Sequence, residues 1–197
     1  MADQVGIANT ALRRLAANPI VSFADGTKSA NCVNAFYEET RDDLLRAHAW
    51  NFATTRVKLA QLSADPAFGF DHAYGLPADW VRTVSVHDND AGVGSIVFKE
   101  ETQDDQNVLL SDAEDVYLRY VAKITDPNCM PPDFRRALSR ALATAMALDL
   151  SGSNTIRDAC DTEATKLLLR AKSADALGSS PEQRPRGSWA TSRGGRG

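Results

Sequence analysis

The feature that most constrains the fold is a change of hydrophobic period within one continuous stretch, residues 27–62. Up to Ala47 the less polar residues recur at steps of three and four, the spacing of one helix face: Val33, Phe36, Tyr37, Thr40, Leu44 and Ala47. After Trp50 the period becomes two, which is typical of a β-strand, with Phe52, Thr54 and Arg56 on one side. The stretch therefore predicts a long amphipathic helix that leads into a sheet, with Trp50 and Phe52 at the junction.

The opposite face of this predicted helix carries charges, and we expect it to be solvated. Its members are Glu38, Arg41, Asp42, Asp43 and Arg46. Asp42 and Arg46 are spaced for an ion pair along the helix, with the acid first, which is the favourable order. Thr27 or Ser29 is expected to cap the helix N-terminus.

Further elements are predicted on both sides of this stretch. Residues 3–17 predict a first helix capped by Asp3. Residues 63–79 are rich in Pro and Gly and predict a loop, whose aromatic residues either pin it to the body or form an exposed patch for a partner: Phe68, Phe70 and Tyr74. The segments that follow alternate in polarity with hairpin-sized links and predict antiparallel strands: 80–86, 95–99, 107–110 and 115–124.

The C-terminal half predicts two more helices. Pro131 and Pro132 open the first, which is rich in alanine and ends at Gly152; Asn154 is expected to cap the second, which ends at Gly178. The stripe of the first helix is Phe134, Leu138, Ala141, Leu142, Ala145 and Leu148. The predicted fold is α+β: a helical bundle (1–62 and 125–177), an inserted antiparallel β-sheet domain (63–124) and a Gly/Ser/Arg-rich tail (178–197).

The tail differs in composition from the rest of the chain. It is too poor in apolar residues to offset the entropy of ordering, so we expect it to be disordered or extended in the free protein. Its cationic and aromatic residues can dock into a partner protein, contact nucleic acid or remain inert, and we favour the first: Arg184, Arg186, Trp189, Arg193 and Arg196.

Composition bounds the class of protein. The 197 residues carry a formal net charge of −4, which is too small to indicate a partner. No apolar run approaches the roughly 18 residues of a membrane span. The three cysteines are far apart and lack the spacing of a metal site, so we expect reduced, buried thiols in a cytoplasmic setting: Cys32, Cys129 and Cys160.

Residues that could carry catalysis or bind a metal lack the context that either needs. Nothing apolar near the carboxylates of the helix, Glu38 and Glu39 among them, would separate the pKa values of an acid and a base. An acidic cluster at residues 100–115 lacks the oxygen spacing of a calcium loop. The histidines (His48, His72 and His87) have no second ligand at metal spacing. We therefore expect no catalytic residues, metal or cofactor.

Five segments, in order, resemble a known family. They are A-N-T-A-L-R-R-L followed by D-G-T at 25–27, L-L-R-A-H-A-W-N-F-A at 44–53, Y-G-L-P-A-D-W-V-R at 74–82, Y-V-A-K-I-T-D at 120–126, and P-P-D-F-R-R-A-L-S-R-A-L-A at 131–143. Over about residues 5–170 the chain resembles the head-to-tail adaptor of short-tailed bacteriophages, also called tail tubular protein A or tail accessory factor. The most specific parts are W-N-F-A and L-P-A-D-W, which place Trp50, Phe52, Tyr74, Pro77 and Trp80 at a structural junction.

The resemblance implies a structural virion protein that is not an enzyme. Twelve subunits of that family form a ring at the head–tail junction, between the portal protein and the tail nozzle (tail tubular protein B-like). Double-stranded DNA passes through the ring without specific binding, and no membrane is involved. The family's C-terminal segment reaches toward the portal, so the tail arginines and Trp189 are expected to bind it. Assembly is expected in the host cytoplasm.

Acidic residues suit the lining of such a channel, because they repel DNA phosphates. We therefore expect part of the acidic cluster to face the lumen or the lower rim of the ring: Glu100, Glu101, Asp104 and Asp105. Two other classes remain open. One is a virion-associated cell-wall hydrolase that uses a Glu/Asp pair, and the other is a DNA-binding accessory protein that acts through the basic tail.

Overall fold

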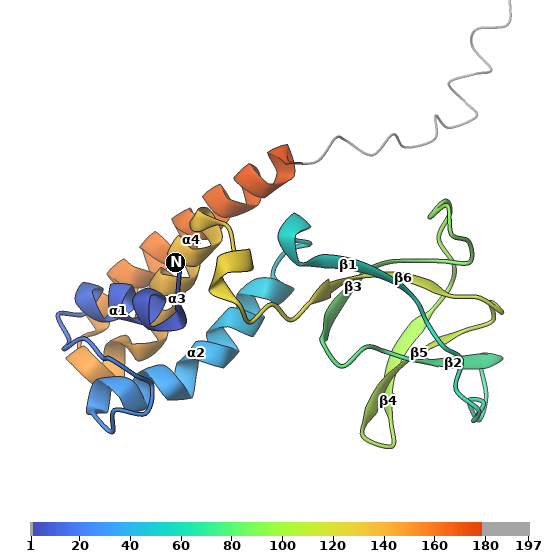
Figure 1. Cartoon of the computed structure of the whole chain (residues 1–197), viewed down its shortest axis with the longest axis horizontal. Coiled ribbons are helices and arrows are strands. Elements are labelled where there is room, and N and C mark those ends of the chain that lie inside the picture. Colours follow the sequence, from blue (N-terminus) through green and yellow to red (C-terminus); the bar gives the residue numbers. More distant parts are fainter. Residues whose placement is uncertain (1, 179–197) are drawn as a thin grey trace, which may run out of the picture.

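The computed structural model describes residues 2–178. Its helices are α1 (Gln4–Arg14), α2 (Lys28–Arg46), α3 (Pro132–Ser151) and α4 (Asn154–Leu177), with short 3-10 turns at Asn51–Ala53 and Pro127–Cys129. Its strands are β1 (Thr54–Lys58), β2 (His72–Gly75), β3 (Trp80–His87), β4 (Lys99–Gln103), β5 (Gln106–Ser111) and β6 (Tyr117–Ala122). The helices form a bundle at one end of the molecule and the strands lie at the other (Figure 1). The predicted α+β class is confirmed.

Local capping chemistry fixes most of the helix ends. The Asp3 carboxylate accepts a hydrogen bond from the Gly6 amide at 2.7 Å, and the Thr27 hydroxyl accepts one from the Ala30 amide at 3.1 Å, as the sequence predicts. Gly152 ends α3 with a φ of 64°, a left-handed conformation that glycine adopts without strain. The cap of α4 is Ser153 rather than Asn154, so that prediction was wrong by one residue.

The bundle has one continuous apolar core, to which α1, α2 and α3 contribute most. The alanines of α3 let α4 pack closely on it, and residues such as Leu12, Val33 and Leu138 are fully buried between the helices. An ion-pair cluster joins three helices at the surface, where Glu163 of α4 contacts Arg14 of α1 at 2.6 Å and Arg140 of α3 at 3.0 Å.

Two expectations for the charged face of α2 were wrong. Arg41 is 1% exposed instead of solvated, because it lies one turn from Tyr37 on the buried side. The predicted Asp42–Arg46 pair is replaced by other contacts: Asp42 accepts from Arg41 at 2.8 Å and pairs with Lys123 at 3.0 Å. The second error arises because Lys123, which is distant in sequence, reaches Asp42.

The β-domain consists of two three-stranded antiparallel sheets, in the orders β1–β6–β3 and β2–β5–β4. β1 lies within the range 1–62 that the sequence assigned to the helical part, yet it pairs along its whole length with β6. The loop predicted at 63–79 contains β2, which pairs with β5. The strand expected at 95–99 begins instead at Lys99, and pairing continues to the turn that follows Gln103.

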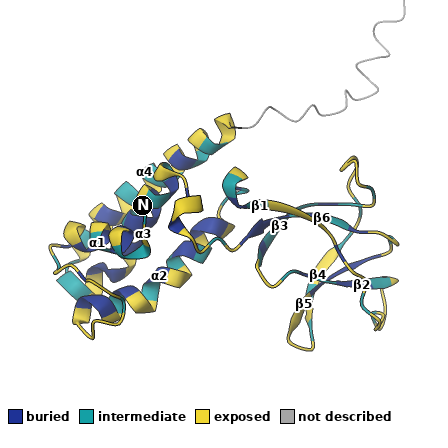
Figure 2. Cartoon of the chain, in the orientation of Figure 1, coloured by how far each residue is buried: buried dark blue, intermediate teal, exposed yellow. Residues whose placement is uncertain are grey.

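The bundle and the β-domain share apolar contacts where they meet. Val81 of β3 and Val121 of β6 are buried in the bundle core, while Leu109, Leu118 and their neighbours form a separate cluster between the two sheets. Buried positions accordingly follow the helix contacts and the inner sides of the sheets, and the outer surfaces are exposed (Figure 2). The β-domain is thus anchored to the bundle by one end of the first sheet.

Candidate functional site

The aromatic junction expected from the sequence lies at the C-terminal end of α2. Trp50 is 1% exposed, and its indole N–H donates to the Leu44 carbonyl at 2.8 Å. The ring of Phe134 lies edge-on to Trp50, with 5.0 Å between centroids, and 4.9 Å from Phe52. This cluster covers the point at which α2 ends and the chain turns into β1. It therefore fixes the direction in which the chain leaves the helix.

Two of the segments that carry the resemblance, 44–53 and 74–82, contact each other here. Arg46, in the 44–53 segment, donates to the Val81 carbonyl at 3.0 Å, and Arg82, in the 74–82 segment, donates to the Arg46 carbonyl at 3.1 Å. These bonds join the last turn of α2 to β3. Because the carbonyl at a helix end lacks an intrahelical donor, Arg82 also satisfies the helix terminus. The segments therefore form a single joint between bundle and β-domain.

The other junction residues support the far side of this joint. Tyr74 of β2 is buried, and its hydroxyl donates to the Glu114 carbonyl at 3.1 Å and also contacts the Ala113 carbonyl. The Pro77 carbonyl accepts from the Trp80 amide at 3.0 Å, which closes the turn into β3. Tyr74 therefore pins the predicted loop to the body, whereas Phe68 is 87% exposed.

Burial makes two tyrosines beside this region weaker acids than usual, because it raises the pKa of both. The pKa of Tyr120 is raised to about 12, mainly by burial and then by its 3.0 Å hydrogen bond to the Asp79 carboxylate. Burial is also the main cause that raises the pKa of Tyr74, with the nearby carboxylates of Asp115 and Glu114 adding to it. Both phenols thus remain protonated donors that hold loops in place.

The last described turn of α4 is fixed to the same junction. Asn51 donates its amide to the Asp175 carboxylate at 3.1 Å and its side chain to the Asp175 carbonyl at 2.6 Å. His48 lies 3.3 Å from that carboxylate. Gly178 therefore lies beside the aromatic cluster, and a pocket of about 270 Å³ is lined there by Trp50, Phe134, Ala171 and Gly178 among others. The proposed portal-binding residues, Arg184, Arg186, Trp189, Arg193 and Arg196, lie outside the described residues.

The acidic residues singled out by the sequence form the β4–β5 hairpin. Glu100 and Glu101 lie on β4, and Asp104 and Asp105 form the turn that connects it to β5. Both turn residues have positive φ, 47° and 62°, which two-residue hairpin loops of the I′ type require and which Asp tolerates better than most residues. The hairpin projects from the side of the β-domain opposite β1 (Figure 1).

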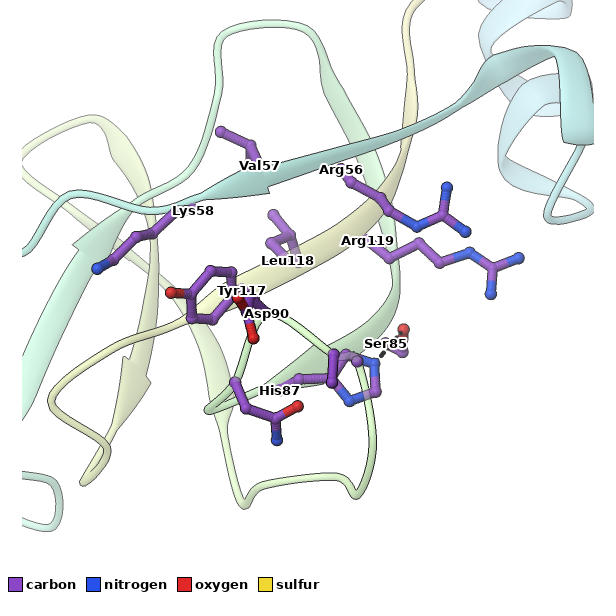
Figure 3. Close-up of a pocket in the computed structure, with 12 residues that line it drawn as sticks. Arg56, Val57, Lys58, Ser85, His87, Asp90, Tyr117, Leu118 and Arg119 are labelled. Carbon is purple, nitrogen blue, oxygen red and sulfur yellow. Dashed lines mark hydrogen bonds between the residues drawn. The ribbon is translucent and has the colours of Figure 1, made fainter.

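A cationic face on the first sheet was not predicted. Arg56 of β1 and Arg119 of β6 are direct cross-strand partners, and Lys58 and His87 lie on either side of Tyr117 in the next row. Their side chains line an open depression of about 380 Å³, in which Arg56 and Arg119 extend side by side (Figure 3). Lys58 pairs with Asp115 at 2.8 Å, which raises the pKa of the lysine. The sequence signal was the period-two spacing of Arg56 and Lys58.

The histidines and cysteines that could have served as metal ligands or nucleophiles do not form a common site. Among the described residues no group of three His, Cys, Asp or Glu side chains is arranged to hold a metal ion. His72 contacts Gln61 at 2.9 Å, and His87 contacts Ser85 at 2.9 Å. Cys160 is buried, as expected, and Cys32 is half-buried, but Cys129 is exposed, so the expectation of burial was wrong for Cys129. No helix between residues 2 and 178 is both long and apolar enough to cross a membrane.

Comparison with known proteins does not identify a family for this chain. A scan of protein-family models finds no match to this chain, and a search of curated proteins finds no relative.

Proposed function

We propose that this chain is a structural head-to-tail adaptor of a short-tailed bacteriophage. In this proposal its subunits form a ring, of twelve copies as in the family it resembles, between the portal protein and the tail nozzle. DNA passes through the central channel without specific binding. The observation that carries the proposal is the joint formed by two segments of the resemblance, 44–53 and 74–82, through the bonds of Arg46 and Arg82, which lie beside its most specific parts.

That joint gives the two segments a mechanical role. Trp50 and Phe134 hold the end of α2, and Arg82 ties it to β3, so the bundle and the β-domain have a defined relative orientation. An elongated subunit with different elements at its two ends can contact two different rings at once (Figure 1). The fixed orientation then keeps the portal-facing and nozzle-facing surfaces in register around the channel.

The acidic hairpin suits a surface near DNA. Asp104 and Asp105 are exposed at its tip, and Glu100 and Glu101 extend along β4. Carboxylates repel the phosphate backbone, so a rim of them keeps DNA from adhering as it passes. We therefore place the tip at the lumen or lower rim of the ring. A ring structure with the hairpin on the outer wall would contradict this placement.

The direct test is co-sedimentation with portal rings from the same phage. The full chain is compared with a chain truncated after Leu177. This truncation keeps every described helix and strand, and Gly178 is the only described residue that it removes. A full-length variant with Arg184, Arg186, Arg193 and Arg196 all changed to Gln serves as the matched control for tail charge. Binding of the full chain that both variants lose supports the adaptor and assigns portal docking to the tail cations.

The other outcomes are also decisive. Binding retained by both variants supports the adaptor and removes the tail from docking. Absence of binding by the full chain contradicts the adaptor. Salt-sensitive affinity of the tail for DNA would then favour the accessory-protein alternative. Lytic activity lost on Glu38→Gln or Glu39→Gln would favour the hydrolase.

A further inference from the structure

The β-domain leaves one edge of each sheet open on opposite sides. β1 is an edge of the first sheet, and β4 is an edge of the second; each is five residues long. Four of the five β1 residues are exposed, as are three of the five in β4. Within residues 2–178 no strand pairs with the outer edge of either. An open edge presents unpaired N–H and C=O groups to any strand that can reach it.

The two edges carry opposite charges. β1 contains the cations Arg56 and Lys58 and no acid, and the guanidinium of Arg119 lies directly behind Arg56 on β6. β4 contains Glu100 and Glu101 with one lysine, Lys99, which pairs with Glu101 at 2.6 Å. The turn after β4 adds Asp104 and Asp105. Successive side chains of a strand point to opposite faces, and Glu101 shares its face with its partner Lys99, so Glu100 is the acid of β4 that can meet Arg56. The opposite charges of Arg56 and Glu100, the equal length and the open backbone groups make the edges complementary.

One chain cannot bring its own two edges together. β1 runs along the upper side of the β-domain in Figure 1, and β4 runs along the lower side. Contact between them therefore requires a second copy, and the contact joins two different surfaces. Head-to-tail contacts of this kind produce rings when the rotation between copies closes.

We propose that the β1 edge of one copy accepts the β4 edge of a second copy as an added strand. The contact rests on the proposed ring and identifies the surface that joins neighbouring subunits. The second sheet of each copy thereby continues the first sheet of its neighbour. The acidic lining of the channel is then confined to the hairpin tip, Asp104 and Asp105, because Glu100 and Glu101 lie at the subunit contact.

The test is charge reversal followed by restoration, in the full chain. Arg56→Glu alone and Glu100→Lys alone are each expected to weaken self-association at least about tenfold, since juxtaposed like charges are unfavourable. A chain with both changes exchanges the two charges and is expected to recover to within about threefold. Arg157→Glu, on the exposed surface of α4, is the control and is expected to have no effect.

Sedimentation velocity over a concentration series, alone and with portal rings, measures these effects. Hydrogen exchange of the amides in β1 and β4 is measured on the same samples. Protection of both strands on assembly is expected. The contact is overturned if the wild-type chain stays monomeric alone and on portal rings, if restoration fails in a folded double variant, or if neither strand gains protection.

The contact and the adaptor can fail separately. Portal binding that persists while charge reversal changes nothing leaves the adaptor intact and removes this interface. Reversal and restoration of self-association without portal binding establish the interface and remove the adaptor. Circular dichroism of each variant at the concentration used confirms that it is folded.

Discussion

The bundle and the β-domain bury their apolar residues in different ways. The bundle has one continuous core, in which Leu12, Val33 and Leu138 are fully buried and to which all four described helices contribute. The β-domain instead has a cluster between its sheets, around Leu109 and Leu118, and a smaller one on the far side of β5. Its outer faces and two of its edges remain exposed (Figure 2).

The difference shows how one small chain can use one region for its folding stability and another for contacts with other chains. Helices satisfy their backbone groups internally, so a bundle can close around its core and need no partner. Three-stranded sheets leave two edges each, and their unpaired groups favour further pairing. The charged residues of the β-domain, such as Arg56 and Glu100, lie on those edges. We therefore assign the bundle to holding the subunit together and the β-domain to assembly.

The largest expected effects come from the two cores. Phe134→Ala should lower the free energy of unfolding by about 3–5 kcal/mol, and Leu109→Ala by about 2–5 kcal/mol, because each leaves a cavity. Residue-level hydrogen exchange should show faster exchange throughout the bundle for the first and within the β-domain for the second. Leu148→Ala, at a position that is 44% exposed, is the control. If Leu109→Ala increased the amide exchange rates of α3 and β5 equally, the two cores would not be independent.

A smaller effect is expected at Asp42, which pairs with Arg41 of its own helix and with Lys123 next to β6. Arg41 is buried, and its carboxylate partner Asp42 is one-third exposed (33%). Asp42→Asn should cost about 1–3 kcal/mol, less than the loss of a fully buried pair, because water can partly replace the carboxylate. Arg41→Met should change stability by less than about 1 kcal/mol, since it removes a buried charge with an unpaired nitrogen.

Chemical denaturation monitored by circular dichroism measures both variants. Lys123→Met is the matched control, because it removes the more exposed partner of Asp42 and should cost less than about 1 kcal/mol. If Arg41→Met is more destabilising than Asp42→Asn, the guanidinium itself stabilises the contact and the physical account given for it fails.

The smallest effects concern two tyrosines, one in each region. Burial raises the pKa of Tyr37 in α2 to about 12, and burial with the Asp79 hydrogen bond raises the pKa of Tyr120 in β6 to about 12. The folded chain therefore holds these protons more tightly than the unfolded chain, in which the pKa is about 10. The resulting stability is complete below pH 10 and is lost as the pH rises from 10 through 12.

Ultraviolet titration of the phenolates distinguishes the regions. Asp79→Asn should lower the pKa of Tyr120 but keep it above 10, because burial is its main cause. The pKa of Tyr37 should not move, since Asp79 contributes nothing to it. If Asp79→Asn shifted the pKa values of both Tyr120 and Tyr37, the titrations of the two regions would be coupled.

Local chemistry explains what the sequence predicted well. The ends of α1 and α2 depend on side chains within three residues of the backbone groups they cap, so Asp3 and Thr27 were identified correctly. Antiparallel strands and the α+β class followed from period and link length. Trp50 was placed at the junction because the hydrophobic period changes there. Each of these features depends on neighbours in the chain.

Pairing over long distances explains what was missed. β4 was placed too early because the apolar residues 95–98 resemble a strand, whereas the turn at Asp104 and Asp105 sets the register backward from Gln103 to Lys99. β2 has only four residues, and it is a strand because it pairs with β5. Arg41 was assigned to the solvated face, whereas it lies one turn from the buried Tyr37 and is itself 1% exposed.

The sequence by itself determined the helices, the caps of α1 and α2 and the order α–α–β–α–α, because these depend on interactions among residues close together in the chain. The tertiary structure alone decided that Arg46 and Arg82 bond across the joint and that Arg56 meets Arg119 on one face. It also decided which strands become edges. These features require segments far apart in sequence to lie side by side, and the loss of chain entropy on closing such loops is recovered only by the packing of the whole domain.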